Sequence, residues 1–399
     1  MKQKQRLGAL ALALVMALTA LTACGGKPSN EPANSSGSSS DSSGNAAAAP
    51  MDLSKITDPY LSVSGLAADE VVATLGSAEI TAADYLYWLY RVIDDYLAQF
   101  GGQMTTLPWD SEMQDGLTFG QYMLDDALDV ASYYCTVRQM ALDAGLSPDP
   151  EVAATVDQQY ADLVFQAGAK EELVIHSLWA QMLTKDLLTK LNEHSGLYTQ
   201  LLQQRFGEDS GNSPTDAEVM AYLEESGQYR AKHILLATID LETREPLDEA
   251  AIAQKKATAD DLLAQLRAAE DPIALFDQLM NEHSEDSGLA ANPDGYTTAK
   301  GQMVAPFEEA ALALQDGEIS EVVESDFGYH IILRLPMNPD EFRDKCTNAL
   351  FQDTLTEDRD RLGLEKTPAF ETLNVENFWN NMLSLQTAVQ AEAAAARND

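Results

Sequence analysis

Two histidines occupy matching places in two apolar segments. His233 lies near the start of "YRAKHILLATI" (229–239), and His330 lies inside "DFGYHIILRL" (326–335). Both segments have the apolar composition of buried strands, and the whole chain has only 5 histidines. A neutral imidazole carries one hydrogen-bond donor and one acceptor, so two histidines on one face of a sheet can satisfy each other away from water. The pair therefore predicts either a hydrogen-bonded core contact or part of a functional site.

The segments around these strands predict the elements that position them. Residues 51–227 have mostly helical periodicity, with Thr81 as an N-cap and helices expected at 119–144, 150–167, 171–191 and 195–206. Residues 228–336 alternate strands, turns and helices, and residues 337–399 return to helix. We therefore predict an α+β protein in which a small module interrupts one helical domain. The flanking helical parts are expected to pack together, because an inserted module needs only closely spaced termini.

The N-terminus predicts export. A basic head, "MKQKQR", precedes an apolar run that is too short for a comfortable membrane span and ends at "LTAC" (21–24). This resembles a bacterial lipoprotein signal peptide over residues 1–23, with lipidation at Cys24; an ordinary secretory leader is the alternative. The expected location is the extracytoplasmic face of the cell membrane, held by lipid chains.

Composition narrows the choice of partners. Residues 24–50 are rich in Ser, Gly, Asn and Pro, which predicts a flexible tether. The chain has 64 Asp plus Glu against 25 Lys plus Arg, a net charge of -39. This balance argues against nucleic acid as a partner and against electrostatic docking on anionic lipid, so attachment to the membrane falls to Cys24.

The two remaining cysteines lie in helical stretches. Cys135 and Cys346 have no metal-ligand spacing, and we expect buried free thiols. A disulfide between them is the alternative, because an oxidising compartment permits it.

Five short motifs in order carry a family resemblance. They are "KHILL", "HSEDS", "GQMVAPFEEAALAL", "GEIS" and "FGYHIIL". Together they resemble the parvulin family of peptidyl-prolyl isomerases over residues 228–336. The leader, the helical regions and the central module together resemble PrsA-type foldase lipoproteins and share the broad plan of SurA-type chaperones. The resemblance implies four antiparallel strands wrapped by helices.

The resemblance also implies site residues. His233 and His330 match the paired histidines of the family, Asp286 falls where the family carries a cysteine or aspartate, and Ser325 matches a hydroxyl position. The residues expected to hold the proline ring are Met303 and Phe307, with Tyr296 filling part of a gap.

Two departures concern the pocket and its loop. Thr298 stands where the family usually has an aromatic residue, and Phe327 replaces a commonly small one. The loop after the first strand, "DLETREPLDEAA", is largely acidic with a single Arg244, so selection of phosphorylated substrates is not expected.

A metal site is the competing interpretation of the polar residues. His233, His283, Asp286 and His330 are all capable ligands. Their apolar neighbours suit a ring pocket better, and His283, at the end of a helical stretch, is expected to face solvent. We therefore expect neither a metal nor a cofactor.

The leading hypothesis is a membrane-anchored foldase that isomerises X-Pro bonds in newly exported proteins and binds unfolded chains. The alternative is a non-catalytic holdase with a degenerate parvulin module. A solute-binding lipoprotein ranks third, because it predicts two α/β lobes. Whether the protein forms a homodimer stays open.

Overall fold

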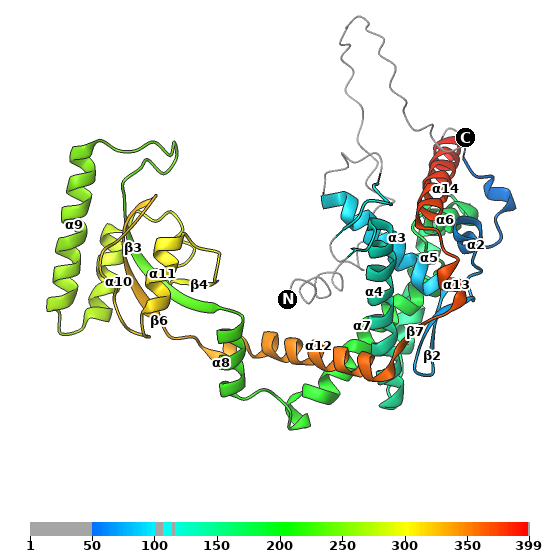
Figure 1. Cartoon of the computed structure of the whole chain (residues 1–399), viewed down its shortest axis with the longest axis horizontal. Coiled ribbons are helices and arrows are strands. Elements are labelled where there is room, and N and C mark those ends of the chain that lie inside the picture. Colours follow the sequence, from blue (N-terminus) through cyan, green and yellow to red (C-terminus); the bar gives the residue numbers. More distant parts are fainter. Residues whose placement is uncertain (1–49, 100–106, 114–115, 398–399) are drawn as a thin grey trace, which may run out of the picture. The chain divides into compact units, whose positions relative to one another are not determined.

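The computed structural model describes residues 50–99, 107–113 and 116–397, which fall into two compact units (Figure 1). Unit 1 comprises the described residues up to Ser210 and from Phe351 onward, and unit 2 comprises Gly211–Leu350. The expected signal peptide, Cys24 and nearly all of the tether lie outside the described residues. Within the described part of the chain, no helix has the length and apolar character needed to cross a membrane.

Unit 1 is mainly helical and contains one small antiparallel sheet. The strands are β1 (Val71–Leu75), β2 (Ala78–Thr81) and β7 (Leu364–Lys366), in the order β2-β1-β7. The helices are η3 (Leu53–Lys55), α2 (Pro59–Ser64), α3 (Ala82–Gln99), α4 (Phe119–Asp143), α5 (Pro150–Gln166), α6 (Glu171–Trp179), α7 (Lys185–Phe206), η5 (Glu208–Ser210), α13 (Pro368–Glu371) and α14 (Val375–Ala396).

Local capping explains where these helices begin. The Thr81 hydroxyl accepts a hydrogen bond from the Asp84 amide at 3.3 Å, at the start of α3. The break between two helices was predicted at residues 192–194, and this is wrong. The structure has the break at residues 180–184: α6 ends at Trp179 and Met182 has a φ of 55°. Thr184 then caps α7, which continues without a break through residues 192–194. The break occurs at 180–184 because the Thr184 side chain satisfies the Leu187 amide there.

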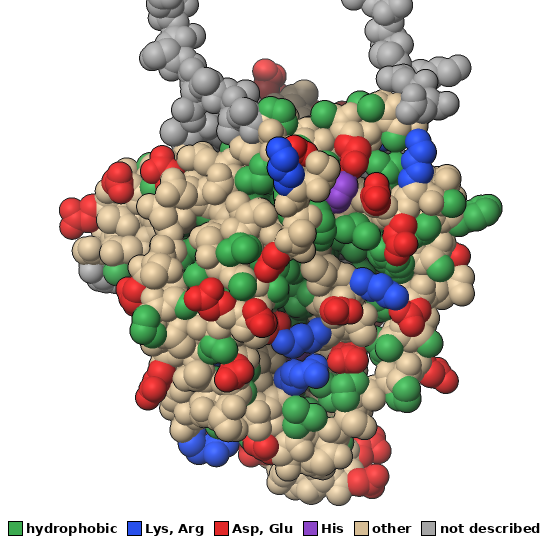
Figure 2. Space-filling view, turned by 90° about the vertical axis from the view of Figure 1, so that its right-hand side faces the viewer, with side chains coloured by type: hydrophobic (Ala, Val, Ile, Leu, Met, Phe, Trp, Pro, Cys, Tyr) green, Lys and Arg blue, Asp and Glu red, His purple; other side chains and the backbone are tan. Residues whose placement is uncertain are grey.

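The N- and C-terminal parts of unit 1 share one core, as predicted. In the core, Phe378, Met382 and Leu385 of α14 are buried together with Tyr85 and Leu89 of α3. Strand β7 also adds to β1, although the sequence predicted only helix after residue 336. On the face seen in Figure 2, acidic side chains are scattered among basic and hydrophobic ones.

Unit 2 is a four-stranded antiparallel sheet covered by helices. The strands are β3 (Gln228–Ala237), β4 (Tyr296–Ala299), β5 (Val323–Ser325) and β6 (Gly328–Leu335), in the order β4-β3-β6-β5. The helices are α8 (Asp216–Glu225), α9 (Glu249–Ala268), α10 (Pro272–His283), α11 (Ala305–Ala313) and η6 (Pro339–Glu341); α12 (Arg343–Leu362) begins in this unit and ends in unit 1. The predicted α+β class and the four antiparallel strands are confirmed.

The alternation of side chains along β3 and β6 divides the core of unit 2. Ile234 and Ile331 lie in a cluster with residues of α9 and α10. Ile332 lies in a second cluster with Phe307 and Ala311 of α11. Since His233 and His330 have the opposite parity to Ile234 and Ile331, they point toward the α11 side. Unit 2 is wider than the expected 228–336 module because α8 packs on Phe342 and Cys346.

Candidate active site

The two histidines meet on neighbouring strands. His233 pairs with Ile332 and His330 pairs with Leu235, so the histidines are diagonal neighbours on one face of the sheet. Their Nδ1 atoms lie 3.0 Å apart, and the rings are stacked with an interplanar angle of 13°. Phe307 packs edge-on against both rings; its ring centroid lies 5.1 Å from that of His233 and 5.6 Å from that of His330.

Asp286 extends this contact from the loop after α10. Its Oδ2 atom lies 3.1 Å from Nε2 of His233 and accepts a 2.5 Å hydrogen bond from the Tyr296 hydroxyl. Its Oδ1 atom accepts a hydrogen bond from the Gly288 amide at 3.0 Å. Burial alone raises the pKa of Asp286, but the hydrogen bonds from His233, Tyr296 and Gly288 outweigh it and hold that pKa well below its usual range. Asp286 is therefore a carboxylate.

Ser325 lies at the other end of the same chain of contacts. Its hydroxyl is 2.7 Å from Nε2 of His330 and accepts a hydrogen bond from the Phe327 amide at 3.1 Å. Burial and the neighbouring His233 lower the pKa of His330 to about 3, against an opposing effect of Asp286. His330 is therefore neutral near pH 7, in keeping with a side chain that is only 3% exposed.

These contacts fix the positions of the protons when both imidazoles are neutral. The carboxylate of Asp286 can only accept, so Nε2 of His233 carries a hydrogen and Nδ1 of His233 accepts. Nδ1 of His330 must then donate to His233, and Nε2 of His330 accepts from Ser325. All four ring nitrogens are engaged within the network.

A pocket of about 390 Å³ opens beside this network. His233, Asp286, Tyr296, Met303, Phe307 and His330 all line it, so the structure brings six of the seven site residues predicted in this module to one cavity. Ser325 does not line the pocket and contacts two lining residues, the imidazole of His330 and the backbone amide of Phe327. Apolar walls with a few convergent polar groups are typical of a small-ligand site.

Several residues of the pocket were not predicted as site residues. They are Leu235, Leu241, Arg244, Ser287, Gln302, Val304 and Phe327. The Arg244 guanidinium lies 5.3 Å from the centre of the Phe327 ring. Phe327 and Arg244 both stood out in the sequence against the family pattern, and this signal could have identified them as pocket residues. Thr298 is not part of the lining, whereas Tyr296, two residues earlier on β4, is.

The other predicted polar residues lie elsewhere. His283, at the end of α10, is exposed as expected, and its Nε2 lies 3.9 Å from Glu282. No group of three His, Cys, Asp or Glu side chains among the described residues has a geometry that holds a metal ion. Cys135 and Cys346 are both free thiols; Cys346 is buried and Cys135 is partly exposed.

Comparisons with known proteins agree with the motif order. Residues 233–335 match the family model described as Rotamase, PPIC-type PPIase domain. The chain is 33% identical over 135 residues to Foldase protein PrsA of Bacillus subtilis (33% of this chain, 39% of that one). It is 31% identical over 180 residues to Foldase protein PrsA of Staphylococcus aureus (44% of this chain, 50% of that one). The chain thus spans half or less of the length of these relatives.

Some solved structures, PrsA among them, are matched over a larger share of the chain. The crystal structure of PrsA from Bacillus subtilis covers 63% of this chain and 90% of its own, with 23% identity and a TM-score of 0.23. A TM-score this low has no bearing on the overall fold, so the assignment rests on the sequence matches. The module that holds the paired histidines is a parvulin-type peptidyl-prolyl cis/trans isomerase domain, in a chain similar in part of its length to PrsA foldases.

Proposed function

We propose that this protein is an extracytoplasmic foldase that catalyses cis/trans isomerisation of X-Pro bonds in newly exported proteins. The observation that carries the proposal is the pocket of about 390 Å³ in which the apolar side chains Met303 and Phe307 face a hydrogen-bonded polar wall. Rotation about X-Pro faces a barrier of roughly 18–20 kcal/mol from amide resonance. No bond breaks, so the reaction needs a site that favours the twisted amide over the planar one.

The apolar part of the pocket grips the proline ring. Phe307, a residue of α11, is 3% exposed and packs edge-on against both imidazoles. Met303 is partly exposed at the pocket wall. Holding the ring in a dry slot lets the preceding residue rotate against it. Loss of water also strengthens every polar contact with the twisted amide.

The histidines act by shaping the site. Each ring nitrogen of His233 and His330 already has a partner, so neither ring has a free nitrogen to offer the substrate. Their stacked planes hold Phe307 on one side and orient Asp286 on the other. Ser325 acts as a positioning residue, because it lies outside the pocket lining and holds the His330 imidazole and the Phe327 amide.

Asp286 supplies the negative charge beside the reacting amide. A carboxylate there opposes a build-up of negative charge on the substrate carbonyl and thereby disfavours the planar, charge-separated resonance form. The Tyr296 hydroxyl and the Gly288 amide fix its orientation. The anionic state persists at neutral pH because those hydrogen bonds stabilise it.

The proposal includes the cellular setting. Lipidation at Cys24 would hold the protein on the outer face of the membrane, with residues 24–50 as a tether. Unit 1 would bind unfolded clients while unit 2 acts on their prolines. The sequence of residues 1–24 supports the membrane setting. The names of the similar foldases support a role in the folding of client proteins.

The test is cis/trans exchange of an X-Pro peptide, measured by NMR with the full chain. We expect the native protein to accelerate the exchange. Met303→Ala should reduce this acceleration at least tenfold, because the variant lacks one of the apolar side chains that line the pocket. Asp286→Asn should reduce the rate while preserving shape. Met220→Ala, at a methionine on α8 that is 40% exposed, is the matched control and should leave the rate unchanged.

A native protein that suppresses aggregation of an unfolded client yet leaves the exchange rate unchanged would refute the isomerase proposal. The protein would then be a non-catalytic holdase.

A further inference from the structure

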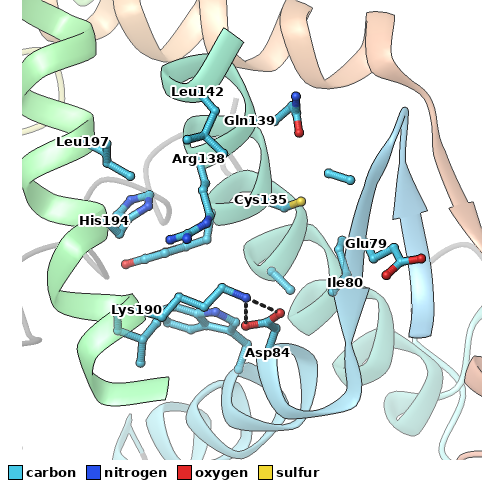
Figure 3. A pocket seen from close by; sticks show the side chains of 15 residues that line it. Glu79, Ile80, Asp84, Cys135, Arg138, Gln139, Leu142, Lys190, His194 and Leu197 are labelled. Carbon is cyan, nitrogen blue, oxygen red and sulfur yellow. Dashed lines mark hydrogen bonds and ion pairs between the residues drawn. The ribbon is translucent and has the colours of Figure 1, made fainter. Parts of the chain in front are cut away.

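A second pocket, of about 230 Å³, lies within unit 1, between β2, α3, α4 and α7 (Figure 3). Its lining comes from residues far apart in sequence, such as Ile80 of β2, Cys135 of α4 and Leu197 of α7. Nothing in the proposed isomerisation uses this pocket, so it is a separate candidate site.

The wall of the pocket is aromatic and aliphatic. The rings of Tyr134 and His194 are stacked at 3.9 Å between centroids, and Trp88 lies 4.3 Å from Tyr134. Leu142, another lining residue, is 48% exposed, so an apolar surface continues from the pocket to solvent. Such a surface gains free energy when an apolar group covers it.

Three of the four charged side chains that line the pocket are held in ion pairs, and the fourth, Glu79, is exposed on β2. Lys190 Nζ lies 2.6 Å from both carboxylate oxygens of Asp84 (dashed in Figure 3). Arg138 lies 3.3 Å from Glu193. Burial, assisted by Arg138, lowers the pKa of His194 to about 3, so its ring adds no charge. A ligand that used Asp84, Lys190 or Arg138 as a counter-ion would have to break one of these pairs, whereas an uncharged ligand would not.

His194 offers a polar contact in this setting. Among the described residues, neither of its ring nitrogens has a hydrogen-bond partner, and Figure 3 shows the ring beside Arg138 at the pocket. A neutral imidazole can donate to, or accept from, a peptide group. A peptide backbone next to an inserted side chain would supply that partner.

We propose that this pocket binds one aromatic or large aliphatic side chain of an unfolded polypeptide, with the adjoining peptide group hydrogen-bonded to His194. The inference rests on the proposed function, because it names the place where unit 1 holds a client chain. The volume suffices: a cavity of about 150 Å³ is enough for a benzene ring, and this one is about 230 Å³.

The first test uses short Gly/Ser peptides with a single central Phe, Ala or Asp. They contain no proline, so the isomerase pocket is not engaged by an X-Pro bond. Binding to the full native chain is read as protection of Cys135 from iodoacetamide, by mass spectrometry of the fragment that contains it. Cys346, in unit 2 and 1% exposed, is the internal reference.

We expect the Phe peptide to protect Cys135 with at least about tenfold higher affinity than the Ala or Asp peptide, as full burial of a large apolar side chain implies. Equal protection by all three peptides, or none by any, would overturn the proposal.

Variants provide the second test, with polarisation of a labelled Phe peptide. Cys135→Trp fills the pocket and should weaken binding about tenfold; Leu142→Ser removes the exposed apolar edge without touching the core and should weaken it severalfold. Phe165→Ser is the matched control, because Phe165 is 84% exposed on α5 and does not line the pocket. Folding of each variant is checked by circular dichroism and Tm. Native affinity in a folded Cys135→Trp, or equal weakening by Phe165→Ser, would overturn the proposal.

These outcomes are separable from those of the proposed function. An X-Pro rate enhancement without Phe-peptide binding would leave the isomerase intact and overturn this inference. Phe-peptide binding without enhancement of the X-Pro exchange rate would support this inference and refute the proposed isomerase activity.

Discussion

Acid should destabilise unit 2 through His330. The pKa of this histidine is about 3 in the folded protein and 6.5 in the unfolded chain. Between these values the unfolded state binds the extra proton, so stability falls as pH drops from 6.5 toward 3 and is fully present above 6.5. The physical cause is that a protonated imidazole would be buried beside His233 and would lose its acceptor for the Ser325 hydroxyl.

The magnitude follows from the shift. Each pH unit in that interval is worth about 1.36 kcal/mol, so moving from pH 7.5 to 5.0 should lower the unfolding free energy of unit 2 by about 2 kcal/mol through this group. His330→Gln cannot titrate and should lack this loss, although it starts from a lower stability. His283→Gln removes an exposed histidine and should retain the loss.

Hydrogen exchange of the β6 amides in the full chain measures this quantity for unit 2 alone. Tryptophan fluorescence follows unit 1 separately, because all 4 tryptophans of the chain belong to it. The difference between native protein and His330→Gln isolates the histidine from the many carboxylates common to both. An equal loss of protection at pH 5.0 in the native protein and in His330→Gln would refute the assignment of a buried neutral His330.

Three further predictions concern the site and the two cores. Gly328→Ala should destabilise unit 2 by about 3 kcal/mol or more, because Gly328 has a φ of 143° and an added Cβ would collide with the Leu236 carbonyl oxygen. The control Gly301→Ala should cost only about 1–2 kcal/mol, because Gly301 has a φ of 83° but open space around it. Equal losses of stability in the two variants, measured by hydrogen exchange, would contradict this prediction. Tyr296→Phe removes a hydrogen bond to the Asp286 carboxylate, so the pKa of Asp286 should rise, as titration of the carboxyl carbon by NMR would show; an unchanged pKa would contradict the contact. Phe378→Ala in α14 should destabilise unit 1 by about 3–5 kcal/mol in tryptophan-monitored urea unfolding, whereas Leu383→Ala, at a side chain 42% exposed on the same helix, should have little effect; similar effects would mean that α14 does not complete the core.

Much of the local structure was predictable because short-range interactions decide it. The alternation of apolar residues gave the strands around His233 and His330, and Thr81 marked the start of α3 through its own hydroxyl. Pro272 begins α10, and the Asp271 side chain caps this helix by accepting a hydrogen bond from the Ala274 amide. The break between α6 and α7 was missed because "QMLT" has no glycine or proline to announce it.

Contacts between distant residues were less accessible. The short strand β7 forms only because β1 offers it an edge, and three residues carry too little periodicity to reveal it. The lining of the unit 1 pocket likewise joins α4 to α7 and β2, and no local pattern marks such residues. Arg244 lies at the isomerase pocket because its loop places it over Phe327, which also depends on tertiary packing.

The sequence by itself determined the kind of residues at the site and, within each strand, which side chains share a face with the histidine. It also determined the order of motifs that identifies the isomerase domain. Only the tertiary structure decided that β3 and β6 are neighbours in a register that brings His233 and His330, 97 positions apart, to 3.0 Å. The same holds for Tyr296 as a partner of Asp286 and for Ser325 behind the pocket. The physical reason is that parity is a property of one strand, whereas register and packing depend on all the surfaces that must be buried together.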